Sequence, residues 1–226
     1  MQRAAILAAF IAAAPLASAA APRPVVLELF TSQSCSSCPP ADALLATLAA
    51  TRDDVLALDF HVDYWDYLSW KDRFSLPAAT ARQRTYASLL GSEVYTPQLV
   101  VDGQYQAVGS EAANVATAIA SAKAALAAGP TLSVQPADGH LTIAIGAATG
   151  TAQILLVGYD AQHVTQVGAG ENTGRTLHEV NVVRSIHPIG SWRGSAANLT
   201  VAQPQGDHAA VLLQAADGRI LAAANS

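Results

Sequence analysis

The sequence predicts a mixed α/β fold followed by a small antiparallel β-sandwich-like region, and three observations lead to this prediction. Over residues 24–129, apolar runs that suit strands alternate with Ala- and Leu-rich runs of helical spacing. The chain's two cysteines, Cys35 and Cys38, stand between the first apolar run and the first helical run. After Gly129 and Pro130 the chain changes to short apolar stretches separated by turn residues.

The composition indicates a globular, exported protein. Hydrophobic residues make up 51% and charged residues 13% of the 226 residues, and the formal net charge is −5. This charge argues against nucleic-acid binding, which needs a basic face. Residues 1–20 have a basic start, an apolar stretch and a small-residue cleavage site, as a secretory signal peptide has; an uncleaved anchor is the alternative. We therefore expect a periplasmic or secreted mature chain without a membrane span.

The first half of the mature chain begins with two predicted strands around a helix. Residues 25–30 form a buried strand, and the helix after them begins around residues 35–37, because adjacent prolines fit only its first turn. Residues 55–61 form a second strand, which the crossover helix makes parallel to the first. An aromatic and charged loop follows, and Pro77 opens a helix that ends at Gly91.

A hairpin and a third helix complete this half. Residues 96–101 and 104–108 form strands around an Asp-Gly turn, and residues 111–128 form a helix. The resulting order is βαβ, a helical insertion at about residues 62–92, and ββα. This is the order of the thioredoxin-like fold, which we predict for residues 21–129.

The second half, residues 130–226, is predicted to be a separate β-rich domain. Short apolar runs occur at residues 132–134, 141–145 and 153–157, and the pairs Asp138-Gly139 and Asp217-Gly218 suit two-residue hairpin turns. Short strands at this spacing without a helix signal favour a small antiparallel sandwich.

The cysteine pair is the candidate redox site. Cys35 and Cys38 are three residues apart at the predicted start of a helix, where they can close a disulfide with little backbone movement. The helix dipole and the free N–H groups at that end stabilise a thiolate. We therefore expect Cys35 to be the attacking sulfur and Cys38 to resolve the mixed disulfide. A purely structural disulfide is the alternative.

Two further candidates come from a resemblance to thioredoxin-like proteins. In those proteins a cis-proline opens the third strand and faces the cysteine pair, and Thr96-Pro97 matches that position; an ordinary trans proline at the start of a strand is the alternative. Thioredoxins also carry a buried acidic residue at a place similar to Glu28, although the spacing to Cys35 is one residue longer here. A carboxylate on the solvated face of the strand is the alternative for Glu28.

The loop after the second strand carries more candidates. His61, Asp63 and Trp65 follow the carboxyl end of that strand, where ligands gather in open α/β sheets. His61 and Asp63 could move protons near the sulfurs, and Trp65 could wall a groove, but each alone is more often a structural residue. Four basic residues form either a docking surface for an acidic partner or a solvated helix face, namely Lys71, Arg73, Arg82 and Arg84.

Several longer motifs resemble a known family. Residues 28–42, ELFTSQSCSSCPPAD, and residues 61–66, HVDYWD, are similar to DUF1223, an uncharacterised family of exported bacterial proteins. The resemblance extends to residues 170–175, GENTGR, and residues 181–185, NVVRS, in the β half. It implies a thioredoxin-like fold with a β-rich extension, and it gives no substrate.

The leading prediction is an exported thiol–disulfide oxidoreductase that uses its CSSC motif on a protein or small-molecule thiol or disulfide. The alternatives are a non-catalytic thioredoxin-fold binding module and a copper- or zinc-handling protein that uses Cys35, Cys38 and His61. The metal alternative is weaker because the sequence has no second C-x-x-C pair to supply ligands. We find no motif for a cofactor, and the sequence sets neither the redox direction nor the oligomeric state.

Overall fold

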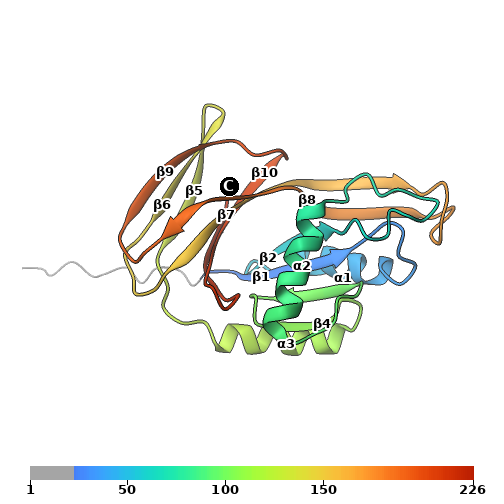
Figure 1. The fold of residues 1–226 in the computed structure, drawn as a ribbon, viewed down its shortest axis with the longest axis horizontal. Coiled ribbons are helices and arrows are strands. Elements are labelled where there is room, and N and C mark those ends of the chain that lie inside the picture. The colour runs from blue at the N-terminus through green and yellow to red at the C-terminus, as the bar shows by residue number, and fades with distance from the viewer. Residues whose placement is uncertain (1–22) are drawn as a thin grey trace, which may run out of the picture.

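The structure is a computed structural model that describes residues 23–226. It has a mixed α/β fold with a large, mostly antiparallel sheet and a second, smaller sheet (Figure 1). The predicted signal peptide, residues 1–20, lies outside the described residues. No helix within residues 23–226 combines the length and the apolar character needed to cross a bilayer.

The first half contains the predicted alternation of strands and helices. In chain order these are β1 (Val25–Thr31), α1 (Pro39–Thr51), β2 (Val55–His61), α2 (Pro77–Leu90), β3 (Gln98–Val101), β4 (Tyr105–Val108) and α3 (Ala112–Ala124). The helix α1 begins at Pro39, later than predicted, because the cysteines form a separate turn ahead of it. The helix α3 ends at Ala124 and not at 128; within residues 125–129 only Leu126 is partly buried, so little packing favours a longer helix.

The second half consists of seven strands within the described residues. They are β5 (Leu132–Ala137), β6 (His140–Ile145), β7 (Ala152–Gln166), β8 (Thr176–Trp192), β9 (Ala197–Ala202), β10 (His208–Gln214) and β11 (Ile220–Asn225). The predicted Asp-Gly turns connect β5 to β6 and β10 to β11. The strands β7 and β8 are much longer than predicted and form a hairpin, the long orange arms of Figure 1.

The large sheet runs through both halves of the chain. Its strand order is β11-β10-β7-β8-β2-β1-β3-β4, with β1 and β2 parallel. The strand β8 joins β2 in parallel through Asp59 and Val182, and Asn181 donates from Nδ2 to the carbonyl of Ala57 at 2.9 Å. The C-terminal strands therefore do not form only a separate sandwich, because four of them continue the sheet of the first half. The division into two domains near residue 130 stays a prediction.

Three apolar clusters pack the helices and the smaller sheet against the large sheet. Helices α1 and α3 pack on one face of β1, β2, β3 and β4 around Leu27 and Leu45. On the other face, α2 packs with β7, β8, β10 and β11 around Phe60 and Leu212. The three-stranded sheet β5-β6-β9 packs on β7, β10 and β11 through residues such as Ile143. The sandwich-like packing predicted for the second half thus exists, but one of its two layers belongs to the large sheet.

Candidate functional site

The two cysteines form a disulfide in the turn between β1 and α1, which we call the CSSC turn (residues 35–38). Their Cα atoms are 5.4 Å apart, and Cys38 is the residue that precedes the first turn of α1. Pro39 and Pro40 occupy the first helical positions, where a missing N–H breaks no helical hydrogen bond. Cys35 is 2% exposed and Cys38 is fully buried, so the sulfurs are covered while the serines between them are exposed.

Thr96 and Trp65, both singled out from the sequence, lie beside Cys35. The Thr96 hydroxyl donates to Sγ of Cys35 at 3.3 Å, and Nε1 of Trp65 donates to the same hydroxyl at 2.8 Å. The Thr96–Pro97 peptide bond is cis, as the sequence predicts. The loop after β2 and the start of β3 thus meet at the cysteine that the sequence predicts to be the attacking one.

A group of buried ionisable side chains lies between the first turn of α1 and the sheet, and we call it the acid cluster. Its members are Asp42, Asp59, His61, Asp72 and Glu179. Asp42 is one helical turn after Cys38 and accepts a hydrogen bond from the Thr31 hydroxyl at 2.8 Å. Burial, and then the charge of Asp59, raises the pKa of Asp42 well above its ordinary value of 3.8. Burial also raises the pKa of Asp59, against the attraction of His61.

His61 is the cation of this cluster. Its Nδ1 lies 2.6 Å from Oδ2 of Asp72, and its Nε2 lies 3.4 Å from Oδ2 of Asp59 in an orientation that makes no hydrogen bond. Burial opposes the charged imidazole, but the two carboxylates outweigh burial and raise the pKa of His61 well above 6.5. The same attraction outweighs burial at Asp72 and lowers the pKa of that carboxyl. His61 and Asp72 therefore form a buried ion pair. The raised pKa values of Asp42 and Asp59 favour the protonated forms of these two carboxyls instead.

Gln33 connects the acid cluster to the C-terminal half. Its backbone N–H donates to Asp72 at 2.8 Å, and its side-chain amide donates to Glu179 on β8 at 2.7 Å. Trp70 donates to the other end of the Gln33 amide at 3.1 Å. Burial raises the pKa of Glu179, although His61 and the amide of Gln33 act in the opposite direction. The cluster is thus built from β2, α1, the loop after β2, and β8.

Two predicted site residues lie elsewhere. Glu28 is fully buried, but its side chain is on the α2 face, where it forms an ion pair with Arg82 and accepts a 2.6 Å hydrogen bond from Tyr86. It is neither at the cysteines nor on a solvated face. Asp63 accepts a hydrogen bond from the Thr80 hydroxyl at 2.5 Å and so ties the loop to α2. Arg82 is one of the four basic residues considered as a docking surface, but its guanidinium donates hydrogen bonds to the buried Glu28 carboxylate.

The sequence contained a signal for part of what was missed. Asp59 lies inside an apolar strand two residues before His61, so the period of a strand puts both side chains on one face. A carboxylate in a buried strand needs a partner or a proton, so Asp59 could have been singled out from the sequence. Nothing local pointed to Glu179, because β8 meets β2 only through long-range pairing.

The connection between β7 and β8, residues 167–175, lies against the CSSC turn, and we call it the tip. The side-chain amide of Asn172 donates to the carbonyls of Gln33 at 3.0 Å and Cys35 at 2.9 Å. The backbone N–H of Ser36 donates to the Glu171 carboxylate at 3.1 Å. Hydrogen bonds from Ser36 lower the pKa of Glu171, so this carboxylate is charged. Figure 1 shows the hairpin reaching the same end of the molecule as the start of α1.

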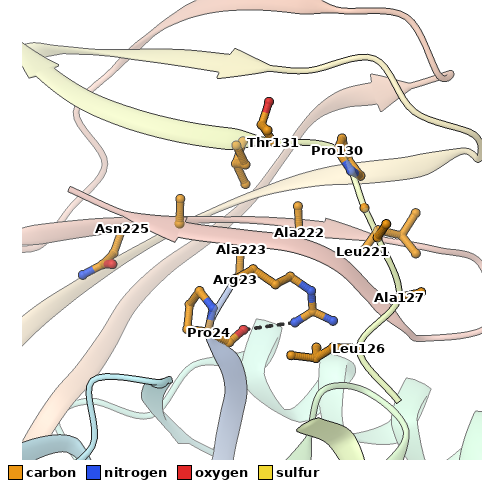
Figure 2. A pocket seen from close by; sticks show the side chains of 14 residues that line it. Arg23, Pro24, Leu126, Ala127, Pro130, Thr131, Leu221, Ala222, Ala223 and Asn225 are labelled. Atoms are coloured by element: carbon orange, nitrogen blue, oxygen red, sulfur yellow. Dashed lines mark hydrogen bonds between the residues drawn. The ribbon is translucent and has the colours of Figure 1, made fainter. Parts of the chain in front are cut away.

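Other features stand apart from this site. Across residues 23–226, no group of three or more His, Cys, Asp or Glu side chains has the geometry to hold a metal ion, so Cys35, Cys38 and His61 do not assemble into a ligand set. A cavity of about 770 Å³ opens between the segment at Arg23, the connection after α3, and β11 (Figure 2). Its walls are mainly apolar and include Pro130 and Leu221, and none of the residues of the CSSC turn lines it.

The family of the chain follows from the comparison with family models. The model described as "Protein of unknown function (DUF1223)" matches residues 26–214, most of the chain. The chain belongs to the DUF1223 family. The match covers both the CSSC turn and the tip, so the contact between them lies within the DUF1223 region.

Two solved structures resemble this DUF1223 protein over most of its length. Protein AGR_C_4864 from Agrobacterium tumefaciens is 30% identical, with a TM-score of 0.80 over 92% of this chain and 95% of that one. HBP35 of Porphyromonas gingivalis is 16% identical, with a TM-score of 0.61 over 92% of this chain and 76% of that one, a likeness of fold alone. No curated protein matches the DUF1223 chain.

Proposed function

We propose that this protein is a thiol–disulfide oxidoreductase of the thioredoxin-like class, with Cys35 and Cys38 as its redox pair. The observation that carries the proposal is a disulfide at the start of α1, with the Thr96 hydroxyl on Cys35 and buried carboxyl groups one helical turn beyond Cys38. The strand order β2-β1-β3-β4, with α1 and α3 on one face and α2 on the other, supports the thioredoxin-like class.

The exchange conserves atoms and moves two electrons. A thiolate of a dithiol substrate attacks Sγ of Cys35, the Cys35–Cys38 bond breaks, and Cys38 leaves as a thiolate that takes up a proton. The second substrate thiolate then attacks the substrate sulfur of the mixed disulfide and releases Cys35. The substrate leaves as a disulfide and the protein as a dithiol. The reverse sequence reduces a substrate disulfide, with Cys35 attacking and Cys38 resolving.

The acid cluster supports this chemistry through its protons. Cys38 is fully buried, so its thiolate needs a proton source inside the protein. Asp42 is one turn away on the same helix, and its raised pKa keeps a proton available there. Thr96, which donates to Cys35 in the disulfide, is a donor that can also stabilise the Cys35 thiolate.

We extend the proposal to the compartment. The signal-peptide pattern of residues 1–20 would carry the mature chain into an oxidising space such as the periplasm, where disulfides persist. Protein or small-molecule thiols of that space are the proposed substrates.

Variants of the two cysteines test the proposal. We expect purified wild-type protein to catalyse exchange between a dithiol and glutathione disulfide, and Cys35→Ser to lose this turnover. Cys38→Ser should accumulate a mixed disulfide on Cys35, detectable by mass spectrometry, because no resolving thiol remains. Equal turnover by wild type and Cys35→Ser would overturn the proposal.

The burial of Cys35 supports a second candidate, a binding module that has kept the fold and does not cycle. In that case the disulfide is a fixed part of the structure, and the reduced protein should show no more turnover than Cys35→Ser.

A further inference from the structure

The tip of the β7–β8 hairpin contacts the CSSC turn through Asn172 and Glu171. Asn172 is 1% exposed and its amide group donates to two backbone carbonyls, those of Gln33 and Cys35. Its Oδ1 is buried without a hydrogen-bond partner, so the side chain makes its hydrogen bonds through the amide N–H groups. Asn172 thus fastens the tip to the cysteine that the proposed reaction needs to reach.

The tip itself fits closely against the loop after β2. Gly170 has a φ of +79°, and a Cβ there would lie 3.2 Å from Cβ of Trp70. Trp70 accepts a hydrogen bond at its carbonyl from the Ser34 hydroxyl at 2.6 Å. The tip, this loop and the CSSC turn are therefore joined by direct contacts. Because Cys35 is only 2% exposed, a substrate can reach its Sγ only if neighbouring residues move.

Glu171 adds a charge to this arrangement. Its carboxylate accepts a hydrogen bond from the backbone N–H of Ser36, inside the CSSC turn. Amide N–H groups at such a turn are the groups that stabilise an attacking thiolate. A carboxylate bound there occupies one of them and repels a second negative charge nearby.

We propose that the tip, residues 167–175, is a latch on the CSSC turn, in which Asn172 holds the closed position and Glu171 opposes formation of the Cys35 thiolate. The latch rests on the proposed function, because covering Cys35 matters only if the cysteine pair cycles. In this scheme both are positioning residues, and neither forms or breaks a bond with substrate.

The holding role of Asn172 is tested by the rate at which dithiothreitol reduces the disulfide of the full mature chain. Asn172→Ala removes two hydrogen bonds that hold the tip on the CSSC turn, and we expect reduction to be about ten- to thirtyfold faster. Asn114→Ala, at an exposed position of α3, is the matched control, because it makes the same side-chain change outside the tip and should reduce at the wild-type rate. Thermal unfolding of each variant shows that it is folded. An unchanged rate in Asn172→Ala, or an equal acceleration in Asn114→Ala, overturns the role of Asn172.

The electrostatic role of Glu171 is tested by the redox equilibrium with glutathione at fixed pH. Glu171→Gln removes the charge and keeps the shape, so it stabilises the reduced form and should shift the equilibrium constant toward the dithiol about two- to fivefold. Asp53→Asn makes the same charge change just beyond the far end of α1 and should leave the constant unchanged. A shift of equal size in both variants, or none in Glu171→Gln, overturns the role of Glu171.

These measurements separate the latch from the proposed function. Reduction rate and redox equilibrium need no turnover of substrate. If the Asn172 and Glu171 variants shift the reduction rate and the redox equilibrium as expected, but the protein turns over no substrate, the latch stands and the oxidoreductase proposal fails. If the protein is active but these variants match wild type in both measurements, the oxidoreductase proposal stands and the latch fails.

Discussion

At the scale of single residues, the main feature is a set of carboxyl groups buried beside one imidazolium. Asp42 and Asp59 have raised pKa values because burial disfavours their charged forms. His61 has a raised pKa for the opposite reason, because the carboxylates of Asp72 and Asp59 outweigh its burial. Both effects make the folded state bind more protons than the unfolded chain, so they lower stability as pH rises.

Asp42 allows a test of the expected loss of stability with rising pH. At pH values between 3.8 and its raised folded pKa, folded Asp42 holds a proton that the unfolded chain has lost, so the wild type should lose stability as pH rises through that window. Asp42→Asn does not titrate, and its Oδ1 can still accept from Thr31. We expect the free energy of unfolding of wild type relative to Asp42→Asn to be greatest at and below about pH 4 and to fall toward neutral pH, as measured by urea unfolding. Parallel pH profiles for the two proteins would contradict this.

At the scale of elements, the junction of β8 with β2 depends on Asn181. This residue has a φ of 50°, and its side chain donates to the carbonyl of Ala57 on β2. Asn181→Gly keeps the backbone conformation and loses the hydrogen bond, at a cost of about 0.5–1.5 kcal/mol. Compared with the Gly variant, Asn181→Ala keeps a Cβ in the left-handed region without the polar side chain that lets Asn adopt it, and should cost roughly 1 kcal/mol more. Denaturant unfolding should rank wild type above the Gly variant and the Gly variant above the Ala variant. A more stable Ala variant would show that the left-handed backbone of Asn181 is not needed.

The elements also show why prediction from the sequence succeeded in some places and failed in others. The strand Val55–His61 was predicted with its observed bounds, because an apolar run between turn residues is a local signal. The strand Thr176–Trp192 was missed, since polar residues and Pro188 interrupt its apolar pattern. The partner of a strand that pairs far along the chain leaves no local trace at all.

The residues of the candidate site also divide into those that the sequence predicted and those that it did not. The cysteines, Thr96 and Trp65 could be found because motif and element order bring them together. The position of Glu28 on the α2 face was not predicted, since the period of a strand tells which residues share a face and not which helix covers that face. The side chains of Leu27 and Leu29 point to the α1 face, and Glu28 alternates with them toward α2.

At the scale of the whole molecule, the two halves share a sheet and an apolar cluster. Phe60 and Tyr86 from the first half pack in the same cluster as Leu155, Val183 and Leu212 from the second. A fragment of residues 21–129 would expose these side chains and the edge of β2. We therefore expect the fragment to aggregate, and the full mature chain to unfold in a single cooperative transition by calorimetry. A monomeric fragment that unfolds cooperatively would instead support the predicted boundary at residue 130.

The position of β8 also decides which edges of the large sheet are left without a neighbouring strand. In a sheet that ended at β2, the free N–H and C=O groups of that strand would be open to β-augmentation beside the cysteines. Here β8 covers that edge, and in the described part of the chain the large sheet ends at β4 and β11. Of these, β4 is only four residues long, whereas β11 runs along the cavity of Figure 2. An added strand therefore has its longer template at the β11 edge, across the sheet from the CSSC turn.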